Sequence, residues 1–146
     1  MAYPIVIIPV LVGCIVQLTK FMLSIIRHGK MEWKYLFGPG HMPSAHTAFV
    51  VSLVVVVARL DTIYSTNFAI SFVFAYIVIY DALKIRTNIG YNGAVMNKLI
   101  KNIPGIKKED YPPLKERVGH KPLEVLVGGI MGVILTVLLV FILNDL

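Results

Sequence analysis

Charged side chains are scarce in this chain of 146 residues. Asp, Glu, Lys and Arg together make up 15% of it, whereas hydrophobic residues make up 57%. Because a soluble domain carries about a quarter charged residues, this composition excludes an ordinary soluble protein. Cysteine is also nearly absent, and Cys14 alone cannot form an intrachain disulfide. The sequence shows no long internal repeat and no nucleic-acid-binding motif, so we expect one membrane-embedded domain over residues 1–146 and no nucleic-acid partner.

Four apolar stretches are long enough, or nearly so, to cross a bilayer, whose core of about 30 Å takes about 20 helical residues. They cover residues 1–26, 45–60, 68–83 and 125–144. The second and third are slightly short and are joined by DTIYSTN, which predicts a turn and a helix start. No basic residue precedes the first stretch, which favours a retained span over a signal peptide. Open strand edges are not viable in lipid, so we predict an all-α integral membrane protein with about four transmembrane helices.

Basic residues are distributed unevenly over these spans. Four spans put both termini and the 61–67 turn on one face, and the 27–44 and 86–121 connections on the other. Of the 14 Lys and Arg residues, only Arg59 lies near the first face. The others are Lys20, Arg27, Lys30, Lys34, Lys84, Arg86, Lys98, Lys101, Lys107, Lys108, Lys115, Arg117 and Lys121. Because basic residues in short loops favour the cytoplasmic side, we predict that both long connections face the cytoplasm of the cell.

The 86–121 connection contains an amphipathic segment. Between Ile89 and Ile103, apolar residues recur at near-helical spacing among Asn and Lys residues, and IPG ends the pattern. The pattern fits an interfacial amphipathic helix between the third and fourth spans, and it fits a cytosolic continuation of the third span equally well. The following KKEDYPPLKER predicts a charged loop over the cytosolic mouth of the bundle.

Reactive side chains gather at the cytosolic ends of the spans. They are Lys20, Arg27, His41, His46, Asp81, Lys84, Arg86, His120 and Glu124. A lone Lys at a helix end usually extends to the interface. Ionisable groups that converge from all four spans instead indicate a polar interior site.

The spacing of Lys20 and Arg27, and the residues at the start of the second span, suit a phosphate ligand. Lys20 and Arg27 are two helical turns apart and therefore lie on one face. PSAH opens the second span, where unpaired backbone N–H groups and the Ser44 hydroxyl can hold an anion. His46 lies in the first turn of that helix, where it can donate or accept a proton. These residues predict an anion-binding site.

A nucleophile can come from the start of the last span. His120 and Glu124 are spaced i, i+4, so they are neighbours if the helix begins just before Pro122. A carboxylate bonded to one imidazole nitrogen fixes the tautomer and leaves the other nitrogen free to attack. With the anion site, this pair predicts phosphate hydrolysis.

Three motifs carry a resemblance to a known family. Lys20-x6-Arg27, PSAH at 43–46 and His120-x3-Glu124 resemble the K-x6-R-P, P-S-G-H and S-R-x5-H-x3-D motifs of the type 2 phosphatidic acid phosphatase (PAP2) superfamily. GHMPSAHTA, YDALKIR and ERVGHKPLEVLVGG are similar to its divergent YuiD-like branch, described as related to acid phosphatases and vanadium-dependent haloperoxidases. The resemblance covers the chain from about residue 10 to residue 140.

The resemblance implies a membrane lipid phosphatase that hydrolyses a phosphomonoester or pyrophosphate of a lipid or isoprenoid alcohol. It implies that Lys20 and Arg27 bind the phosphate oxygens and that Ser44 completes the anion site. It also implies that no metal and no other cofactor is needed. The expected partners are the lipid phosphate and the membrane, and assembly into a homo-oligomer stays open.

The same resemblance implies the catalytic roles. His120 would attack phosphorus to form a phosphohistidine, with Glu124 orienting it, and His46 would protonate the leaving alkoxide. Asp81 would orient an arginine or take part in proton transfer; packing of the bundle is the alternative role for this residue.

The chain departs from the family motifs at five positions. His28, Ala45 and Glu124 replace Pro, Gly and Asp, which are mild changes. The S-R pair of the third motif is absent at its expected position, where Leu114 replaces the arginine. We expect Arg86, at the end of the third span, to replace that arginine; Arg117 is the other candidate.

Two further functions fit the same residues. A metal-dependent membrane hydrolase would use His41, His46 and His120 with Asp81 or Glu124 as ligands. A noncatalytic membrane subunit would use the cations to hold anionic lipid headgroups.

Overall fold

The computed structural model describes residues 3–29, 42–104 and 111–144, and helices are its only regular elements. They are α1 (Tyr3–His28), α3 (Ala45–Asp61), α4 (Thr66–Tyr80), a π-helix η1 (Asp81–Ile85), α5 (Arg86–Lys101) and α6 (Pro122–Asn144). The prediction of an all-helical protein is confirmed over these ranges.

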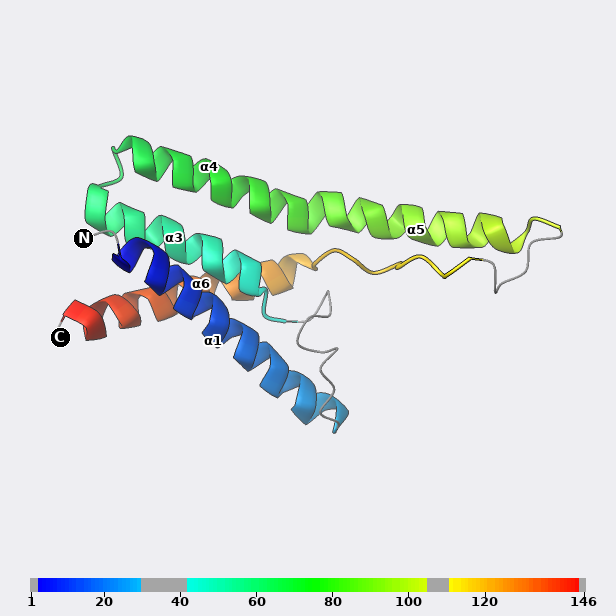
Figure 1. The fold of residues 1–146 in the computed structure, drawn as a ribbon, viewed down its shortest axis with the longest axis horizontal. Coiled ribbons are helices and arrows are strands. Elements are labelled where there is room, and N and C mark those ends of the chain that lie inside the picture. The colour runs from blue at the N-terminus through cyan, green and yellow to red at the C-terminus, as the bar shows by residue number, and fades with distance from the viewer. Residues whose placement is uncertain (1–2, 30–41, 105–110, 145–146) are drawn as a thin grey trace.

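Helix α3 lies at the centre of the bundle and packs against α1, α4 and α6. The core that it shares with α1 is built from small and branched side chains, among them Val12, Val16, Ala48 and Val56. The start of α1, the end of α6 and the α3–α4 turn all lie at one end of the molecule (Figure 1). This is the alternating order of helices expected from the sequence.

Three helical segments are long and apolar enough to cross a membrane. They are Ile5–Ile26, Thr66–Lys101 and Pro122–Leu143. The sequence predicted a third span at 68–83, which is slightly short for a bilayer. In the structure this helix continues to Lys101, so it is long enough to cross one. Helix α3 has 17 residues, fewer than the about 20 that a bilayer core takes, so a fourth complete span stays a prediction.

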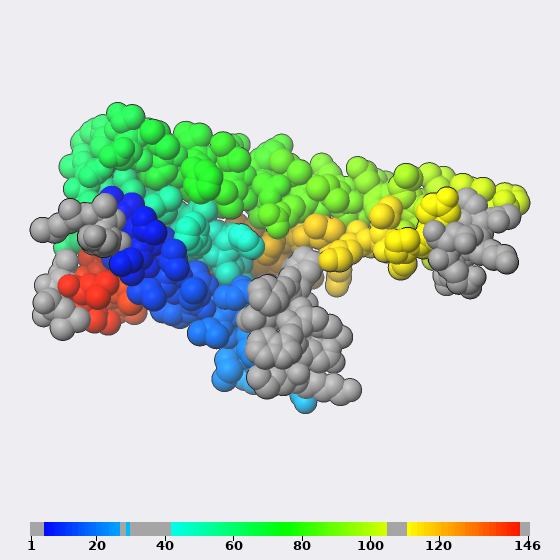
Figure 2. Space-filling view, in the orientation of Figure 1, coloured from blue at the N-terminus to red at the C-terminus, as the bar shows by residue number. Residues whose placement is uncertain are grey.

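Helices α4, η1 and α5 form one continuous segment of 36 residues. At 1.5 Å per residue it is about 54 Å long, well beyond the about 30 Å of a bilayer core. Figures 1 and 2 show α5 extending past the rest of the bundle, with the segment 111–118 running back beside it. The sequence left residues 89–103 either as an interfacial helix or as a continuation of the third span. In the structure, α5 is the continuation of the third span.

The α3–α4 turn shows the predicted helix start. Ser65 caps α4, and its side-chain oxygen accepts a hydrogen bond from the N–H of Phe68 at 3.1 Å. Thr62 takes a positive φ of 83° where α3 ends. The Asn67 amide donates to the Asp61 carboxylate at 2.6 Å and links the two helices. These contacts explain how DTIYSTN closes the hairpin.

Glycines bring α6 close to α3. A Cβ atom on Gly128 would collide with the carbonyl oxygen of Ser44, and one on Gly132 would lie 2.8 Å from that of Ala48. Further along, the buried Thr136 hydroxyl donates to Ser52 at 2.6 Å. This close approach sets where the first turn of α6 lies relative to the first turn of α3.

Candidate active site

The predicted site residues whose side chains the structure describes come together at the end of the bundle opposite the termini. Lys20 of α1 is only 7% exposed, and Glu124 of α6 is 6% exposed. Their charges act on one another. The charges of Lys20, Asp81 and Arg86 also act on His46 in the first turn of α3. Residues from α1, α3, η1, α5 and α6 therefore form one polar cluster.

The start of α3 is held by a pair of hydroxyl groups. Ser44 is the N-cap, and its oxygen accepts from the Thr47 N–H at 3.4 Å and from the Thr47 hydroxyl at 2.9 Å. Both acceptor positions of the Ser44 oxygen are then used, which leaves its own O–H as a donor. The Ser44 backbone N–H donates to the carbonyl oxygen of Glu124 at 3.1 Å. This bond joins the first turn of α3 to that of α6.

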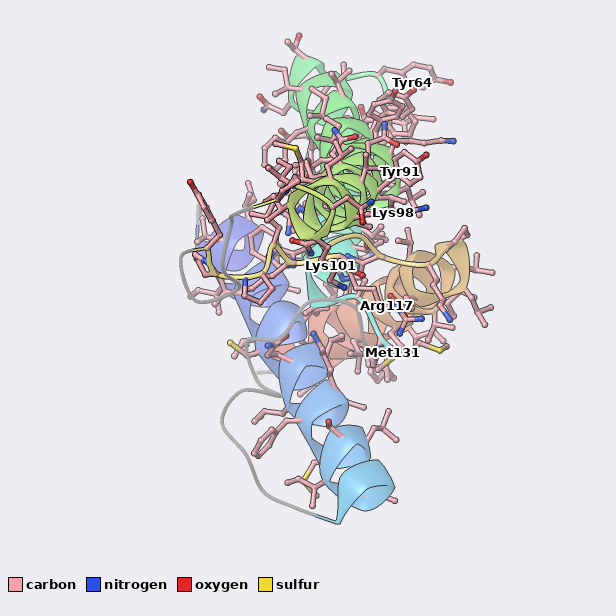
Figure 3. All side chains as sticks on the ribbon, turned by 90° about the vertical axis from the view of Figure 1, so that its right-hand side faces the viewer. Tyr64, Tyr91, Lys98, Lys101, Arg117 and Met131 are labelled. Carbon is pink, nitrogen blue, oxygen red and sulfur yellow. The ribbon has the colours of Figure 1, made fainter. Side chains whose placement is uncertain are left out.

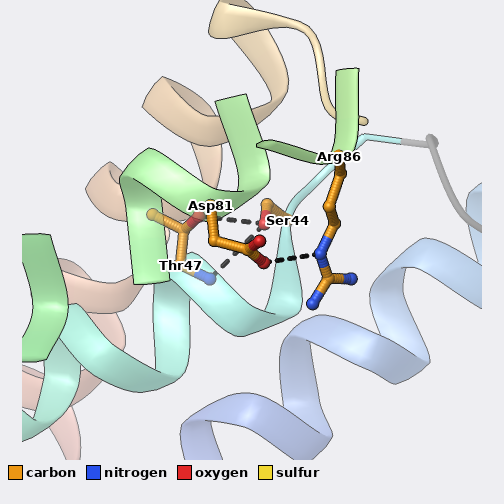
Figure 4. Close-up of polar contacts among 4 residues, drawn as sticks. All are labelled: Ser44, Thr47, Asp81 and Arg86. Atoms are coloured by element: carbon orange, nitrogen blue, oxygen red, sulfur yellow. Dashed lines mark hydrogen bonds and ion pairs between the residues drawn. The ribbon is translucent and has the colours of Figure 1, made fainter. Parts of the chain in front are cut away.

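Asp81 and Arg86 lie beside this helix start (Figure 4). The Arg86 Nε donates to Oδ2 of Asp81 at 2.7 Å. In an α-helix, residues five apart point about 140° away from each other. The wider π-helical turn, in which the Arg86 N–H bonds the carbonyl of Asp81, brings them to one side. π-Helical turns of this kind are frequent at functional sites.

His120 is placed by the same π-helix. Its backbone N–H donates to the carbonyl oxygen of Ala82 at 3.0 Å. Gly119 lies so close to Thr87 that a Cβ atom there would collide with the Thr87 hydroxyl. His120 is 8% exposed, and its Nδ1 is buried without a hydrogen-bond partner among the described residues.

Glu124 makes a different hydrogen bond from the one predicted for it. Its Oε2 accepts from the backbone N–H of Lys121 at 3.1 Å, which caps the first turn of α6. Its charge nevertheless acts on His120. A hydrogen bond between the Glu124 carboxylate and the His120 ring stays a prediction.

Burial and nearby cations lower the pKa of His120 below its ordinary value. Loss of solvation is the main cause, and the charges of Lys20, His46 and Arg86 act in the same direction. The carboxylate of Glu124 opposes them. His120 is therefore neutral at neutral pH, which is the form that a nucleophilic imidazole requires.

The segment before His120 is fixed to α5 by a residue that the sequence did not single out. The Asn97 amide donates to the carbonyl of Leu114 and to Oε1 of Glu116, both at 2.9 Å, and its oxygen accepts from the Leu114 N–H at 3.0 Å. The chain fits closely there, since Cβ atoms on Gly90 and Gly93 would lie 2.6 and 2.7 Å from carbonyls of this segment. Two glycines three residues apart in a polar helix were the signal for this packing.

Other predicted residues are placed less fully. Arg27 lies in α1, but its side chain falls outside what the structure describes, as does His41 altogether. Arg117 is exposed on the segment 111–118 (Figure 3), whereas the charge of Arg86 acts on both His46 and His120. This arrangement supports Arg86 as the replacement arginine.

The alternative of a metal-dependent hydrolase requires several ligand side chains close together, and the described part of the chain does not contain such a group. No group of three His, Cys, Asp or Glu residues there could hold a metal ion. The proposed set also included His41, which lies outside the described residues.

An apolar helical bundle with a buried polar cluster at one end defines this protein as a small helical membrane protein. The chain belongs to the divergent PAP2 family, whose model matches residues 1–135. It is 35% identical over 136 residues to the uncharacterized membrane protein YuiD of Bacillus subtilis strain 168, and the match covers 86% of each chain. No solved structure matches it. The resemblance stated from the motifs is thereby confirmed.

Proposed function

We propose that this protein is a membrane phosphatase that cleaves a phosphomonoester or pyrophosphate of a lipid or isoprenoid alcohol. One observation carries the proposal: a neutral, buried His120 lies within reach of the charges of Lys20, His46 and Arg86. Cations bind the phosphate oxygens and stabilise charge in the transition state, while a neutral imidazole supplies the attacking electron pair.

The proposed first step transfers the phosphoryl group to His120. Nδ1 is buried, so Nε2 is the attacking nitrogen. The new N–P bond forms as the bond from phosphorus to the ester oxygen breaks, and His46 gives the leaving alkoxide a proton. Lys20, Arg27 and Arg86 hold the phosphoryl oxygens.

The second step regenerates the enzyme. His46, now neutral, takes a proton from water, the water oxygen attacks phosphorus, and the N–P bond breaks to release inorganic phosphate. The Ser44 hydroxyl and the first N–H groups of α3 support the anion in both steps. The site faces the cytoplasm in this proposal, because the long connections carry most of the basic residues.

The test is phosphate release by the purified full-length protein from a panel of lipid and isoprenoid phosphates. Wild-type protein should hydrolyse at least one of them and be inhibited by vanadate, which imitates the trigonal-bipyramidal transition state. His120→Ala should be inactive. Equal hydrolysis by this variant would show that His120 is not the nucleophile.

A noncatalytic role in binding anionic headgroups is the second candidate. The observation that favours it is the Glu124 carboxylate, which accepts from the Lys121 N–H, while Nδ1 of His120 has no hydrogen-bond partner among the described residues. In that case Lys20→Met and Arg86→Met should weaken binding to vesicles that contain phosphatidic acid, whereas His120→Ala should not. Turnover that depends on His120 would exclude this candidate.

A further inference from the structure

Thr47 lies in the first turn of α3 and has no part in the proposed chemistry. Its hydroxyl donates to the Ser44 oxygen at 2.9 Å, and its backbone N–H donates to the same oxygen at 3.4 Å (Figure 4). Both residues are 1% exposed. An N–H···O distance of 3.4 Å is longer than the usual range of about 2.7–3.2 Å. The Thr47 hydroxyl is therefore the group that holds the Ser44 side chain.

A threonine at this position changes where the Ser44 backbone N–H goes. In a capping box the third residue of the helix is Glu or Gln, and its side chain accepts from the N–H of the cap residue. Thr47 occupies that third position, but its hydroxyl donates to the Ser44 oxygen. The Ser44 N–H donates out of the helix, to the carbonyl oxygen of Glu124 at 3.1 Å. A contact that would ordinarily close one helix thus joins two.

We call Ser44, Thr47 and the backbone of Glu124 the α3–α6 joint. Helix α6 packs closely on it, since a Cβ atom on Gly128 would lie 3.1 Å from the Ser44 nitrogen and would collide with the Ser44 carbonyl oxygen. The Thr47 methyl group also meets α6, where it would lie 3.8 Å from a Cβ atom on Gly129. The joint therefore has little room to shift unless one helix moves against the other.

The joint lies between the two histidines of the proposed reaction. His46 is two residues after Ser44 in the first turn of α3, and His120 is two residues before α6 begins at Pro122. The charge of His46 acts on His120, so the two rings are near each other. In the proposed first step His120 attacks phosphorus while His46 gives a proton to the leaving oxygen. The separation of the two rings must therefore be kept.

We propose that Thr47 is a positioning residue, which fixes the first turn of α3 against α6 and thereby sets His46 relative to His120. This inference rests on the proposed phosphatase function, although the joint can also be tested without turnover. Loss of the Thr47 hydroxyl would leave the Ser44 oxygen with the longer N–H bond alone, and the first turn of α3 could then shift. A shift of about 1 Å in a reacting group can lower a rate about 100-fold.

Thr47→Val tests this role because it replaces the hydroxyl with a methyl group. The kcat of the purified full-length variant should fall about 10- to 100-fold on a substrate that wild-type protein hydrolyses. Inorganic phosphate, which the cations hold, should inhibit the variant as it inhibits wild type. Vanadate, which imitates the transition state, should inhibit it less. Thr47→Ser keeps the hydroxyl and should keep the wild-type kcat. An unchanged kcat in Thr47→Val, or an equal loss in Thr47→Ser, would overturn the proposal.

Thr136→Val is the matched control. It removes the hydroxyl of a second buried pair between α3 and α6, which bonds Ser52 at 2.6 Å, about two helical turns beyond Ser44. Both Val variants should lower the midpoint of thermal unfolding, and only Thr47→Val should lower kcat. Equal losses of kcat would show that Thr47 acts through stability alone. If Thr47→Val does not fold, Thr47→Ala, which puts no methyl group against the Ser44 oxygen, replaces it in the comparison.

NMR signals of labelled histidine rings separate failure of the joint from failure of the proposed function. In the full-length protein Thr47→Val should move the signal of His120, which lies on another element, as well as that of the adjacent His46. Thr136→Val should leave the His120 signal where it is. If wild-type protein hydrolyses no lipid or isoprenoid phosphate, the proposed function fails and these signals decide whether the joint sets the two rings. A His120 signal that does not move in Thr47→Val would overturn the joint.

Discussion

The Arg86 Nε donates to Oδ2 of Asp81 at 2.7 Å across a π-helical turn. Both side chains are partly exposed, at 40% for Arg86 and 32% for Asp81, so the ion pair contributes at most about 1 kcal/mol to stability. Its effect is positional, because it directs the guanidinium towards the first turn of α3 (Figure 4).

If Arg86 binds the phosphoryl group, replacing it should weaken phosphate binding. Arg86→Lys keeps the charge but loses the planar guanidinium that can hold Asp81 and phosphate together. A lost charge-assisted hydrogen bond costs about 1.5–3 kcal/mol, or about 10- to 100-fold in the inhibition constant of vanadate. Asp81→Asn should have a smaller effect in the same direction, and Arg59→Lys, near the opposite end of α3, should have none. Loss of vanadate inhibition in Arg117→Lys alone would assign the role to Arg117.

The two histidines should fail at different steps. His120→Ala removes the proposed nucleophile, so no phosphorylated protein should be trapped when labelled substrate is mixed with enzyme and quenched. His46→Ala removes the proposed acid, and turnover should fall about 10²- to 10⁴-fold while the trapped species still forms with substrates that have good leaving groups. Phosphorylation of the His120→Ala protein would place the nucleophile elsewhere.

The pH dependence should follow His120. Its neutral form persists below the ordinary histidine pKa of about 6.5, because burial and neighbouring cations lower the pKa of His120. On the acid side, activity should therefore fall only as the pH drops through a value below that. Glu124→Gln removes the charge that raises the pKa and should move the titration of His120 lower still.

An NMR titration of labelled histidine in the full-length protein measures this shift without relying on activity. Asp61→Asn, at the other end of the bundle, should leave the His120 titration unchanged. A rise in the His120 pKa in the Glu124→Gln protein would show that the carboxylate does not act on the ring as described.

Asn97 should position the segment that carries His120. Asn97→Ala removes three hydrogen bonds to Leu114 and Glu116, so amide hydrogen exchange in residues 111–118 should speed up. Under the proposed function kcat should fall more than KM rises, because His120 is displaced from the bound phosphate. Asn88→Ala, an exposed position on the same helix, is the control. Unchanged exchange in the Asn97→Ala protein would contradict this role.

Two adjacent glycines of α6 should respond in opposite ways to the same change. Gly128→Ala places a methyl group against the carbonyl of Ser44 and should destabilise the protein by about 1–3 kcal/mol. Gly129→Ala meets only side-chain carbons at 3.8 and 3.9 Å and should gain up to about 1 kcal/mol of helix propensity. Thermal unfolding of the two variants in one detergent gives the comparison, and equal destabilisation would contradict the α3–α6 packing.

Local patterns were sufficient for the all-helical fold and for most of the site. Helices were predictable because long apolar runs have no other stable form in lipid. The gathering of Lys20, His46 and His120 at one end was predictable as well, since alternating spans put their connections on two faces. The hydroxyl cap of Ser44 and the hairpin at 61–67 also depend only on neighbouring residues.

Tertiary structure decided the features that depend on residues far apart in the sequence. Periodicity could not tell an interfacial helix from a continuation of the third span at 89–103, because both have one apolar face; continuity with α4 decided it. An α-helical spacing rule also places Asp81 and Arg86 on different faces, and only the π-helical turn pairs them. The hydrogen bond from the Asn97 amide to the Leu114 carbonyl joins residues that are 17 apart in the sequence. No local sequence pattern predicts it. Sequence thus determined which side chains lie at this end of the bundle, and packing between helices determined how they face one another.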